Sequence, residues 1–261
     1  MYFLSNYMGH PAGKDFFMLR IILVLLFVIL FLIIGIPILG IEWIIGKFNK
    51  QAADISQLRL VQWAFRVILF LSGTKLTIIG EENVPKDKAV MYVGNHHSIF
   101  DIITTYTRVP GLTGYVAKKE IEKVPVLRTW MRHLNCLFLD RKDLKAGAKM
   151  IIDAVHKIKS GVSIFIFPEG TRSKDENVTL PFHDGSFKIA TKSGCPIVPV
   201  VLTKTNRIFE DHFPWIKATH VTIEYCEPII LDEMPDDIKR SPANYVWDII
   251  VKKYEENIKI K

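Results

Sequence analysis

One uncharged stretch constrains this chain more than any other feature. No charged residue occurs from Ile21 to Ile41, with Arg20 just before the stretch and Glu42 just after it. A helix rises ~1.5 Å per residue, so this length could just span a hydrocarbon core of ~30 Å. The stretch is too long for a cleaved signal peptide, and no small-x-small cleavage site follows it. The sequence therefore predicts a membrane-anchoring helical segment over residues 1–73, followed by a second domain over residues 74–261.

Pro37 lies in the second half of the uncharged stretch. Because proline lacks an N–H and clashes with the preceding turn, we expect a kink or break there. Two geometries are then open: a single tilted span, or a re-entrant hairpin that enters and leaves by one face. Lysines and arginines are more numerous after the stretch than before it, which places the following domain on the cytoplasmic side of the membrane.

A second hydrophobic stretch, Leu58 to Leu71, is interrupted by Arg59, Gln62 and Arg66. Its apolar residues recur at helical spacing, which predicts an amphipathic helix. Such a helix could lie in the membrane interface with its arginines towards the headgroups. It could equally be an ordinary helix that packs on the domain, and the pattern alone does not decide between the two.

The composition agrees with a membrane protein that meets acidic partners. Hydrophobic residues make up 49% of the 261 residues, and the net charge is +7. A basic balance fits an anionic membrane surface or phosphorylated substrates. The basic residues are scattered rather than gathered in a run, so we expect no nucleic-acid partner. The three cysteines form no Cys-x-x-Cys pair, so we expect reduced thiols and no metal site.

After Gly73 the sequence alternates between short apolar runs and helical stretches. This alternation predicts an α/β domain with a central mixed, largely parallel sheet flanked by helices. Expected strands cover residues 75–80, 89–94, 114–117, 136–139, 162–167, 197–202 and 219–226. Expected helices cover residues 102–107, 125–133, 144–160, 187–193 and 242–258.

The first unusual string, Asn95–Asp101, directly follows an expected strand. It reads Asn-His-His-Ser-Ile-Phe-Asp and places His96 and Asp101 five positions apart. A carboxylate in the first turn of a helix can orient an imidazole in the preceding loop and favour its charged form. His97 is a competing base at a less suitable spacing. The same string also fits a capping box begun by Ser98, in which Asp101 would only stabilise the start of a helix.

The second string, Phe-Pro-Glu-Gly-Thr-Arg-Ser at residues 167–173, follows another expected strand. Gly170 permits a turn whose backbone N–H groups could face a ligand. Thr171 adds a hydroxyl, and Arg172 offers a planar charged fork suited to phosphate. Glu169 could orient the arginine or bind a substrate hydroxyl. The alternative is a plain turn with a surface Arg–Glu pair.

These strings resemble the first and third motifs of the glycerolipid acyltransferase family, and more narrowly the bacterial 1-acyl-sn-glycerol-3-phosphate acyltransferases. Residues 118–121, together with Phe138-Leu139-Asp140-Arg141, are similar to the second motif. Cys195-Pro196-Ile197-Val198-Pro199-Val200 is similar to the fourth. The resemblance runs from about residue 84 to residue 201, with the motifs in the usual order.

The resemblance implies acyl transfer from acyl-CoA or acyl carrier protein to the free hydroxyl of 1-acyl-sn-glycerol-3-phosphate (lysophosphatidic acid), which forms phosphatidic acid. It also implies contact with membrane lipids and no metal or cofactor. His96 would be the general base and Asp101 its orienter. The acceptor would be bound by Glu169, Gly170, Thr171 and Arg172, with Lys118 and Arg141 at the phosphate.

The second motif departs from the family pattern. It usually carries glycines near Leu127 and Asn135, and this chain lacks both. The acceptor could therefore be glycerol-3-phosphate or another lysophospholipid. A membrane lipid-binding protein without turnover is a further alternative. A hydrolase is a third, and it would need a nucleophile, but the chain has no Gly-x-Ser-x-Gly elbow.

Overall fold

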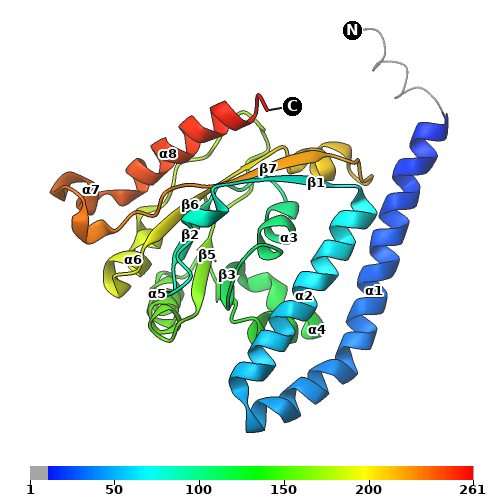
Figure 1. Ribbon diagram of the computed structural model, residues 1–261, viewed down its shortest axis with the longest axis horizontal. Coiled ribbons are helices and arrows are strands. Elements are labelled where there is room, and N and C mark those ends of the chain that lie inside the picture. The colour runs from blue at the N-terminus through cyan, green and yellow to red at the C-terminus, as the bar shows by residue number, and fades with distance from the viewer. Residues whose placement is uncertain (1–10, 261) are drawn as a thin grey trace.

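The computed structural model of the chain describes residues 11–260, with side chains from residue 17 onward. Two long helices lead into an α/β domain (Figure 1). The helices are α1 (Pro11–Phe48), α2 (Lys50–Ser72), α3 (Phe100–Tyr106), α4 (Pro125–His133), α5 (Leu144–Lys159), α6 (Lys188–Ser193), α7 (Asp236–Arg240) and α8 (Pro242–Asn257). Each helix expected in the α/β domain is present within two residues of its predicted bounds, and the short helix α7 was not expected.

The sheet has seven strands among the described residues, in the order β1-β7-β6-β2-β5-β3-β4. They are β1 (Lys75–Ile79), β2 (Met91–Gly94), β3 (Thr113–Lys118), β4 (Leu137–Leu139), β5 (Ser163–Ile166), β6 (Ile197–Thr203) and β7 (His220–Tyr225). The strands from β6 to β4 are parallel to one another. β7 is antiparallel to β6 and parallel to β1. The predicted mixed, largely parallel sheet is confirmed.

Helices cover both faces of this sheet, so its central strands are apolar on both sides. In β5 the side chain of Phe165 joins one apolar cluster, while Ile164 and Ile166 join the other. The first cluster includes residues of α2, α3 and α4, and the second includes residues of α5, α6 and α8. Figure 1 shows these two groups of helices on opposite sides of the sheet.

Helix α1 corrects the expectation of a break at Pro37. The helix runs unbroken from Pro11 to Phe48 with Pro37 inside it, so the chain does not reverse within the uncharged stretch. The choice between a tilted span and a re-entrant anchor stays a prediction. Proline removes one N–H donor, but breaking the helix there would leave several backbone groups without partners in an apolar segment. Figure 1 shows that α1 curves in its last part rather than ending.

Helices α1 and α2 form an antiparallel pair, joined through Asn49 (Figure 1). The Asn49 side chain accepts the N–H of Ala52 at 3.0 Å, which caps the start of α2. At its other end α2 stops at Gly73, which adopts φ +73°. The chain therefore leaves α1, turns back along it, and enters the sheet at Lys75.

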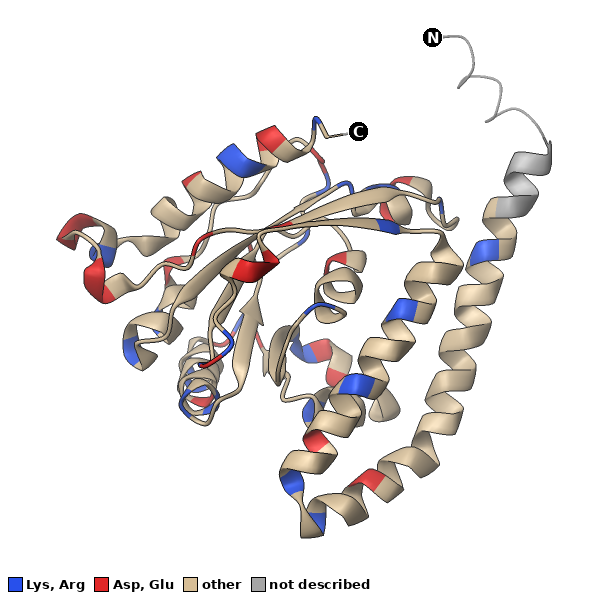
Figure 2. Cartoon of the chain, viewed as in Figure 1, with Lys and Arg blue, Asp and Glu red and all other residues tan. Residues whose placement is uncertain are grey.

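Residues Phe17–Phe48 of α1 are long and apolar enough to cross a membrane. Charged residues are sparse along α1, as Figure 2 shows. Large apolar side chains stay exposed along one side of it, including Ile22, Ile29 and Ile33. The opposite side packs on the rest of the chain, where the rings of Phe31 and Trp130 in α4 lie 5.5 Å apart between centroids.

Helix α2 packs on the domain, as one of the two alternatives for the stretch from Leu58 to Leu71 expected. Its residues Leu58, Val61 and Ile68 belong to the same apolar cluster as the sheet. Gln62 is buried, and its amide donates to the carbonyls of Tyr106, the last residue of α3, and of Val109 just after it. Because α2 shares its core with the sheet, a domain boundary at residue 73 stays a prediction.

We expect Gly114→Ala to lower the free energy of unfolding. Gly114 lies in β3, where an added Cβ would come within 2.1 Å of the carbonyl oxygen of Asn135. Overpacking of this kind typically costs about 1–3 kcal/mol. Thermal unfolding followed by circular dichroism in detergent measures the change.

Gly147→Ala in α5 is the matched control. Its added Cβ would meet only Leu139 Cδ1, at an ordinary 3.9 Å, and alanine favours the helix by roughly 0.5–1 kcal/mol. Equal stability of the Gly114→Ala and Gly147→Ala proteins would contradict this account of Gly114.

Candidate functional site

The predicted site residues gather at one edge of the sheet. The loop carrying His96 follows β2, and residues 167–173 follow β5. Lys118 ends β3, and Arg141 comes two residues after β4. Because these four strands are parallel, all four segments leave the sheet at the edge where ligands collect in α/β folds.

His96 and Asp101 are in direct contact. The Nδ1 atom of His96 lies 2.7 Å from Oδ2 of Asp101. The same oxygen accepts the backbone N–H groups of His97 and Ser98, both at 2.8 Å. Asp101 is fully buried in the first turn of α3. Its carboxylate is therefore held by three donors and cannot turn away from the imidazole.

Ser98 bonds the start of α3, although it is not the N-cap residue that the capping-box pattern indicated. Its Oγ accepts the N–H of Phe100 at 2.9 Å, while Asp101 accepts the N–H of Ser98. The helix itself begins at Phe100, with Ile99 in the N-cap position. Asp101 can therefore bond the backbone at the start of the helix and the imidazole of His96 at the same time.

The contact with Asp101 determines which nitrogen of His96 is available for chemistry. A carboxylate only accepts hydrogen bonds, so Nδ1 carries the proton and Nε2 keeps its lone pair. The His96 side chain is 15% exposed, and its ring stacks on Phe167 at 4.2 Å between centroids. The ring is thereby fixed in a plane, with Nε2 on the side away from the carboxylate.

His97 has a different environment from His96. Its ring is buried and stacks on Tyr254, with ring centroids 5.5 Å apart. Within the described residues neither ring nitrogen of His97 has a hydrogen-bond partner. Burial lowers the pKa of His97, which disfavours its charged form. The residue contributes a backbone N–H to Asp101, while its imidazole makes no hydrogen bond to that carboxylate.

The loop after β5 holds the loop after β2 in place. Oε1 of Glu169 accepts the backbone N–H of His96 at 2.7 Å, and the N–H of Ser173 donates to the carbonyl of His96 at 2.8 Å. Oε2 of Glu169 accepts the N–H of Leu180 at 3.2 Å. Glu169 is therefore buried between the loop after β2 and two parts of its own loop, and it bonds the backbone of both loops. The expectation that it orients Arg172 is wrong, because Arg172 pairs with another carboxylate.

The pKa of Glu169 is raised to about 8, chiefly by burial and to a smaller extent by the nearby charge of Asp101. The two backbone N–H groups act in the opposite direction and favour the charged form. Desolvation is the larger of these effects. Glu169 therefore changes charge close to neutral pH while in contact with the His96 backbone.

Gly170 forms the turn that the sequence predicted. Its φ is +70°, a conformation that other residues rarely adopt. Its own N–H donates to the carbonyl of Phe167 at 3.1 Å, so a ligand contact at this turn would have to come from other backbone N–H groups. Thr171 and Arg172, which follow the turn, are exposed.

Arg172 is anchored by Glu210, a residue that the sequence analysis did not single out. Arg172 Nη1 lies 2.8 Å from Oε1 of Glu210. The same oxygen accepts the N–H of Ile99 at 2.9 Å, and Oε2 accepts the hydroxyl of Ser98 at 2.5 Å. One carboxylate therefore ties the arginine to the start of the helix that carries Asp101.

Nothing in the local sequence around Glu210 marks it. The residue lies in a short 3-10 helix, Glu210–His212, after β6. It reaches the site because β6 is parallel to β2 and ends at the same edge. The buried side chain of Asn95 reinforces this arrangement by bonding the backbone N–H and carbonyl of Leu202 in β6, both at 2.8 Å.

Lys118 and Arg141 lie farther along the edge. β3 and β4 are two and three positions from β2 in the sheet, which corresponds to ~10 Å and ~14 Å between backbones. Both side chains are exposed, and Lys118 pairs with Glu120 of its own segment at 3.3 Å. Arg172 is thus joined to the His96 loop, whereas Lys118 and Arg141 lie farther away along the same edge of the sheet.

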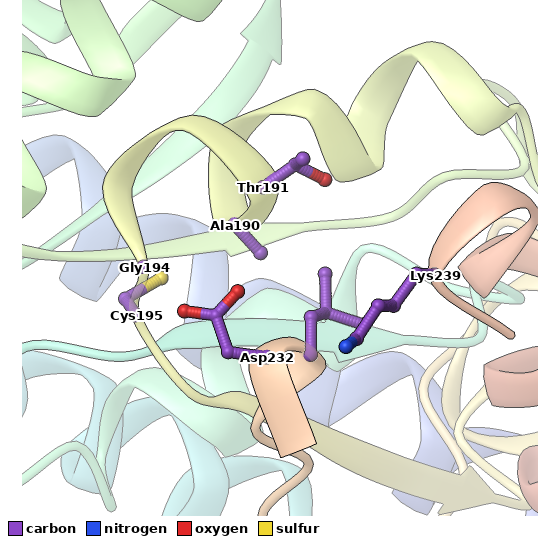
Figure 3. A pocket seen from close by; sticks show the side chains of 7 residues that line it. Ala190, Thr191, Gly194, Cys195, Asp232 and Lys239 are labelled. Carbon is purple, nitrogen blue, oxygen red and sulfur yellow. The ribbon is translucent and has the colours of Figure 1, made fainter. Parts of the chain in front are cut away.

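Two surface hollows lie away from His96. A small one of about 90 Å³ adjoins α6, and the side chains of Asp232 and Lys239 point into it (Figure 3). A larger one of about 480 Å³ is lined by Glu224, Cys226 and Lys253 among others. Both adjoin the amino end of β6 or the carboxyl end of antiparallel β7. They therefore occupy the opposite edge of the sheet from the His96–Asp101 pair.

The chain is similar to known acyltransferases. A family model described as Acyltransferase matches residues 75–203. The 1-acyl-sn-glycerol-3-phosphate acyltransferase of Borreliella burgdorferi is 30% identical over 197 residues, which cover 75% of this chain and 78% of that protein. The enzyme of the same name from Saccharomyces cerevisiae is 28% identical over 209 residues, covering 77% and 69%.

A solved structure shares the fold. The crystal structure of the 1-acyl-sn-glycerophosphate (LPA) acyltransferase PlsC from Thermotoga maritima superposes with a TM-score of 0.78. The match covers 94% of this chain and 97% of that one, at 23% sequence identity. The likeness extends over α1 and α2 as well as the sheet, since it leaves out so little of the chain.

We expect stability to fall as the pH rises towards 8, and Glu169→Gln to weaken that dependence. A carboxyl whose pKa is raised to about 8 binds its proton more tightly in the folded state. The associated stabilisation is fully present below the ordinary carboxyl pKa of 4.5 and is lost as the pH rises through the folded-state value. For one proton the slope approaches about 1.4 kcal/mol per pH unit.

Thermal unfolding between pH 5 and pH 9 measures this slope in both proteins. Gln at position 169 cannot titrate, so its curve should be flatter over the same range. Parallel curves for the two proteins would show that Glu169 does not carry the dependence.

Proposed function

Because the chain belongs to the acyltransferase family, we propose that it transfers a fatty acyl group to the free hydroxyl of 1-acyl-sn-glycerol-3-phosphate, which forms phosphatidic acid. The donor is acyl-CoA or acyl carrier protein. Relatives named for this acceptor support the proposal. The observation that carries it is the 2.7 Å contact between His96 Nδ1 and Asp101, which leaves Nε2 as a base beside the anchored Arg172.

The proposed reaction begins when His96 Nε2 removes the proton of the acceptor hydroxyl. The hydroxyl oxygen attacks the thioester carbonyl, and a tetrahedral intermediate forms. The C–S bond then breaks, and the imidazolium returns its proton to the departing thiolate. The products are phosphatidic acid and the free thiol. Asp101 stabilises the imidazolium while it exists, as the buried acid does in hydrolase triads.

The proposed acceptor site uses Arg172 for the phosphate. Nη1 of Arg172 is engaged by Glu210, while the side chain stays half exposed. The remaining guanidinium donors can then meet a phosphate in fork geometry. Lys118 and Arg141 add positive charge along the same edge. Glu169 and Gly170 fix the conformation of the loop that carries Arg172. The exposed hydroxyl of Thr171 is free to bond the acceptor.

Helix α1 supplies the proposed membrane anchor. The acceptor and the product are membrane lipids, so an enzyme with an exposed apolar helix beside its active domain meets both without extracting them into water. The donors are water-soluble, and the charge bias around α1 favours a catalytic domain on the cytoplasmic side. Both the membrane location and the orientation belong to the proposal.

We expect His96→Ala to lower the rate of thiol release by roughly 10²–10⁴-fold, the usual contribution of a general base. Asp101→Asn should also lower it, because the amide no longer favours the charged imidazole. The assay follows thiol release from acyl-CoA and from acyl carrier protein in detergent, with 1-acyl-sn-glycerol-3-phosphate as the acceptor.

His220→Ala is the matched control, since His220 bonds Thr77 at the edge of the sheet formed by β1 and β7. It should retain full activity. Full activity of the His96→Ala enzyme would end the base assignment. A wild type that used only glycerol-3-phosphate would overturn the acceptor while leaving the chemistry intact.

We expect Arg172→Ala to raise the acceptor KM by roughly 10- to 100-fold, the equivalent of about 1.5–3 kcal/mol for charged hydrogen bonds. Glu210→Gln should raise it less, because the arginine stays but is no longer held by a charged partner. Once Arg172 is absent, Glu210→Gln should not raise the acceptor KM further. Steady-state kinetics on the double-mutant cycle measures this coupling.

Glu81→Gln is the control for losing an Arg–Glu pair. Glu81 binds Arg108 through the same type of contact, at the opposite edge of the sheet, and its loss should leave the acceptor KM unchanged. Additive effects of Arg172→Ala and Glu210→Gln on this KM would contradict the anchoring role of Glu210.

A further inference from the structure

The connection between β6 and β7 contains a loop that closes on itself. The N–H of Lys217 donates to the carbonyl of Ile208 at 2.9 Å. Ile208 and Ile216 at the neck are buried in the apolar cluster that α2 also joins. Loops closed at the neck in this way are compact units that often carry function. The loop from Ile208 to Lys217 therefore has a fixed base on the domain.

The tip of this loop exposes two large aromatic side chains. Phe213 is 74% exposed and Trp215 is 42% exposed. The ring of Phe213 leans on Phe209 at 5.4 Å between centroids, and the N–H of Trp215 donates to the carbonyl of His212 at 2.8 Å. The tip is thus ordered by internal contacts, yet its apolar surface faces outward.

The end of the loop adjoins α1 at the start of its uncharged stretch. A Cβ on Gly73 would lie 3.0 Å from both Ala218 and Arg20, so the end of the loop, the end of α2 and the start of the uncharged stretch meet there. Figure 1 shows the chain before β7 reaching the side of α1 near the top of α2. Phe70, three residues before Gly73, is 82% exposed. The base of the loop therefore lies where exposed apolar residues of α1 and α2 begin.

We propose that the loop Ile208–Lys217 is a second lipid-contacting element, which places Phe213 and Trp215 in the membrane interface beside α1. The inference rests on the membrane anchoring described under the proposed function. Aromatic residues concentrate at the interface, where apolar rings are buried among lipid tails and headgroups. Contiguous exposed apolar surface of this kind marks an interaction site, and its continuity with α1 identifies lipid as what covers it.

The same loop carries Glu210, three residues before Phe213. Glu210 binds Arg172 and the start of α3. The lipid contact and the phosphate-binding arginine are therefore joined through one short, closed loop. An acceptor whose acyl chain lies in the membrane interface would present its phosphate next to the element that holds Arg172.

Depth-dependent fluorescence quenching tests the contact directly. Phe213→Cys is labelled with an environment-sensitive fluorophore, and the full chain is reconstituted into phosphatidylcholine–phosphatidylglycerol vesicles that contain spin-labelled lipid. Ile29→Cys, on the exposed side of α1, is the positive control. Ile152→Cys, 49% exposed on α5, is the negative control. Mock-labelled wild type corrects for the native cysteines.

We expect quenching at positions 213 and 29 and little at position 152. Quenching at 29 without quenching at 213 would overturn the loop contact while leaving the anchor intact. No quenching at 29 would instead overturn the membrane anchoring on which the inference rests. Protection of position 213 from both lipid and water quenchers would show that a second copy or another protein covers it, and would also overturn the proposal.

Kinetics provides a second readout. We expect the Phe213→Ser/Trp215→Ser double variant to raise the KM for acceptor in vesicles several-fold, with little change for a short-chain acceptor dissolved as monomers. Ile152→Ser is the control and should change neither KM. An equal loss of activity on both forms of the acceptor would indicate damage to the catalytic site and would contradict the proposal. An unchanged KM in vesicles would also contradict it, because the loop would then make no lipid contact that matters for acceptor binding.

Discussion

The carboxylate of Asp101 is the group on which the candidate site depends. One of its oxygens accepts from His96 Nδ1 and from the N–H groups of His97 and Ser98. The carboxylate is fully buried, where charge-assisted hydrogen bonds are strong and an unpaired charge would be costly. The helix start, the loop after β2 and the imidazole tautomer are therefore determined by a single interaction.

Two further carboxylates connect this centre to its surroundings. Glu169 joins the loop after β5 to the backbone of His96. Glu210 joins Arg172, from that same loop, to the start of α3. Each acid bonds backbone N–H groups that would otherwise lack partners at the edge of the sheet. The site is thus a set of loops tied together by acidic side chains, and its geometry resists the displacement of any one loop.

The extent of the sequence prediction can be seen in particular elements. β5 was expected from an apolar run bounded by a turn, and α5 from helical periodicity with a glycine after it, because both signals are local. A kink or a break was expected at Pro37, and only the break is absent, since the local cost of proline is small beside that of breaking a helix in an apolar segment. In the sequence Gln62 interrupts an apolar stretch, yet in the structure it is buried and bonds carbonyls at the end of α3 and just after it. Its partners are more than forty residues away in the chain, so no local pattern could reveal them.

By itself the sequence determined the uncharged helix, the alternation that builds the α/β sheet, and the spacing that allows Asp101 to reach His96 within one turn. These features depend on residues that are neighbours in the chain. Only the tertiary structure decided that Arg172 pairs with Glu210 rather than Glu169, that Glu169 holds the His96 backbone, and that His97 turns away to stack on Tyr254. Those contacts arise because parallel strands bring distant loops to one edge of the sheet. Because these carboxylates are removed from water at that edge, each one is hydrogen-bonded by the donors that lie next to it in the folded chain.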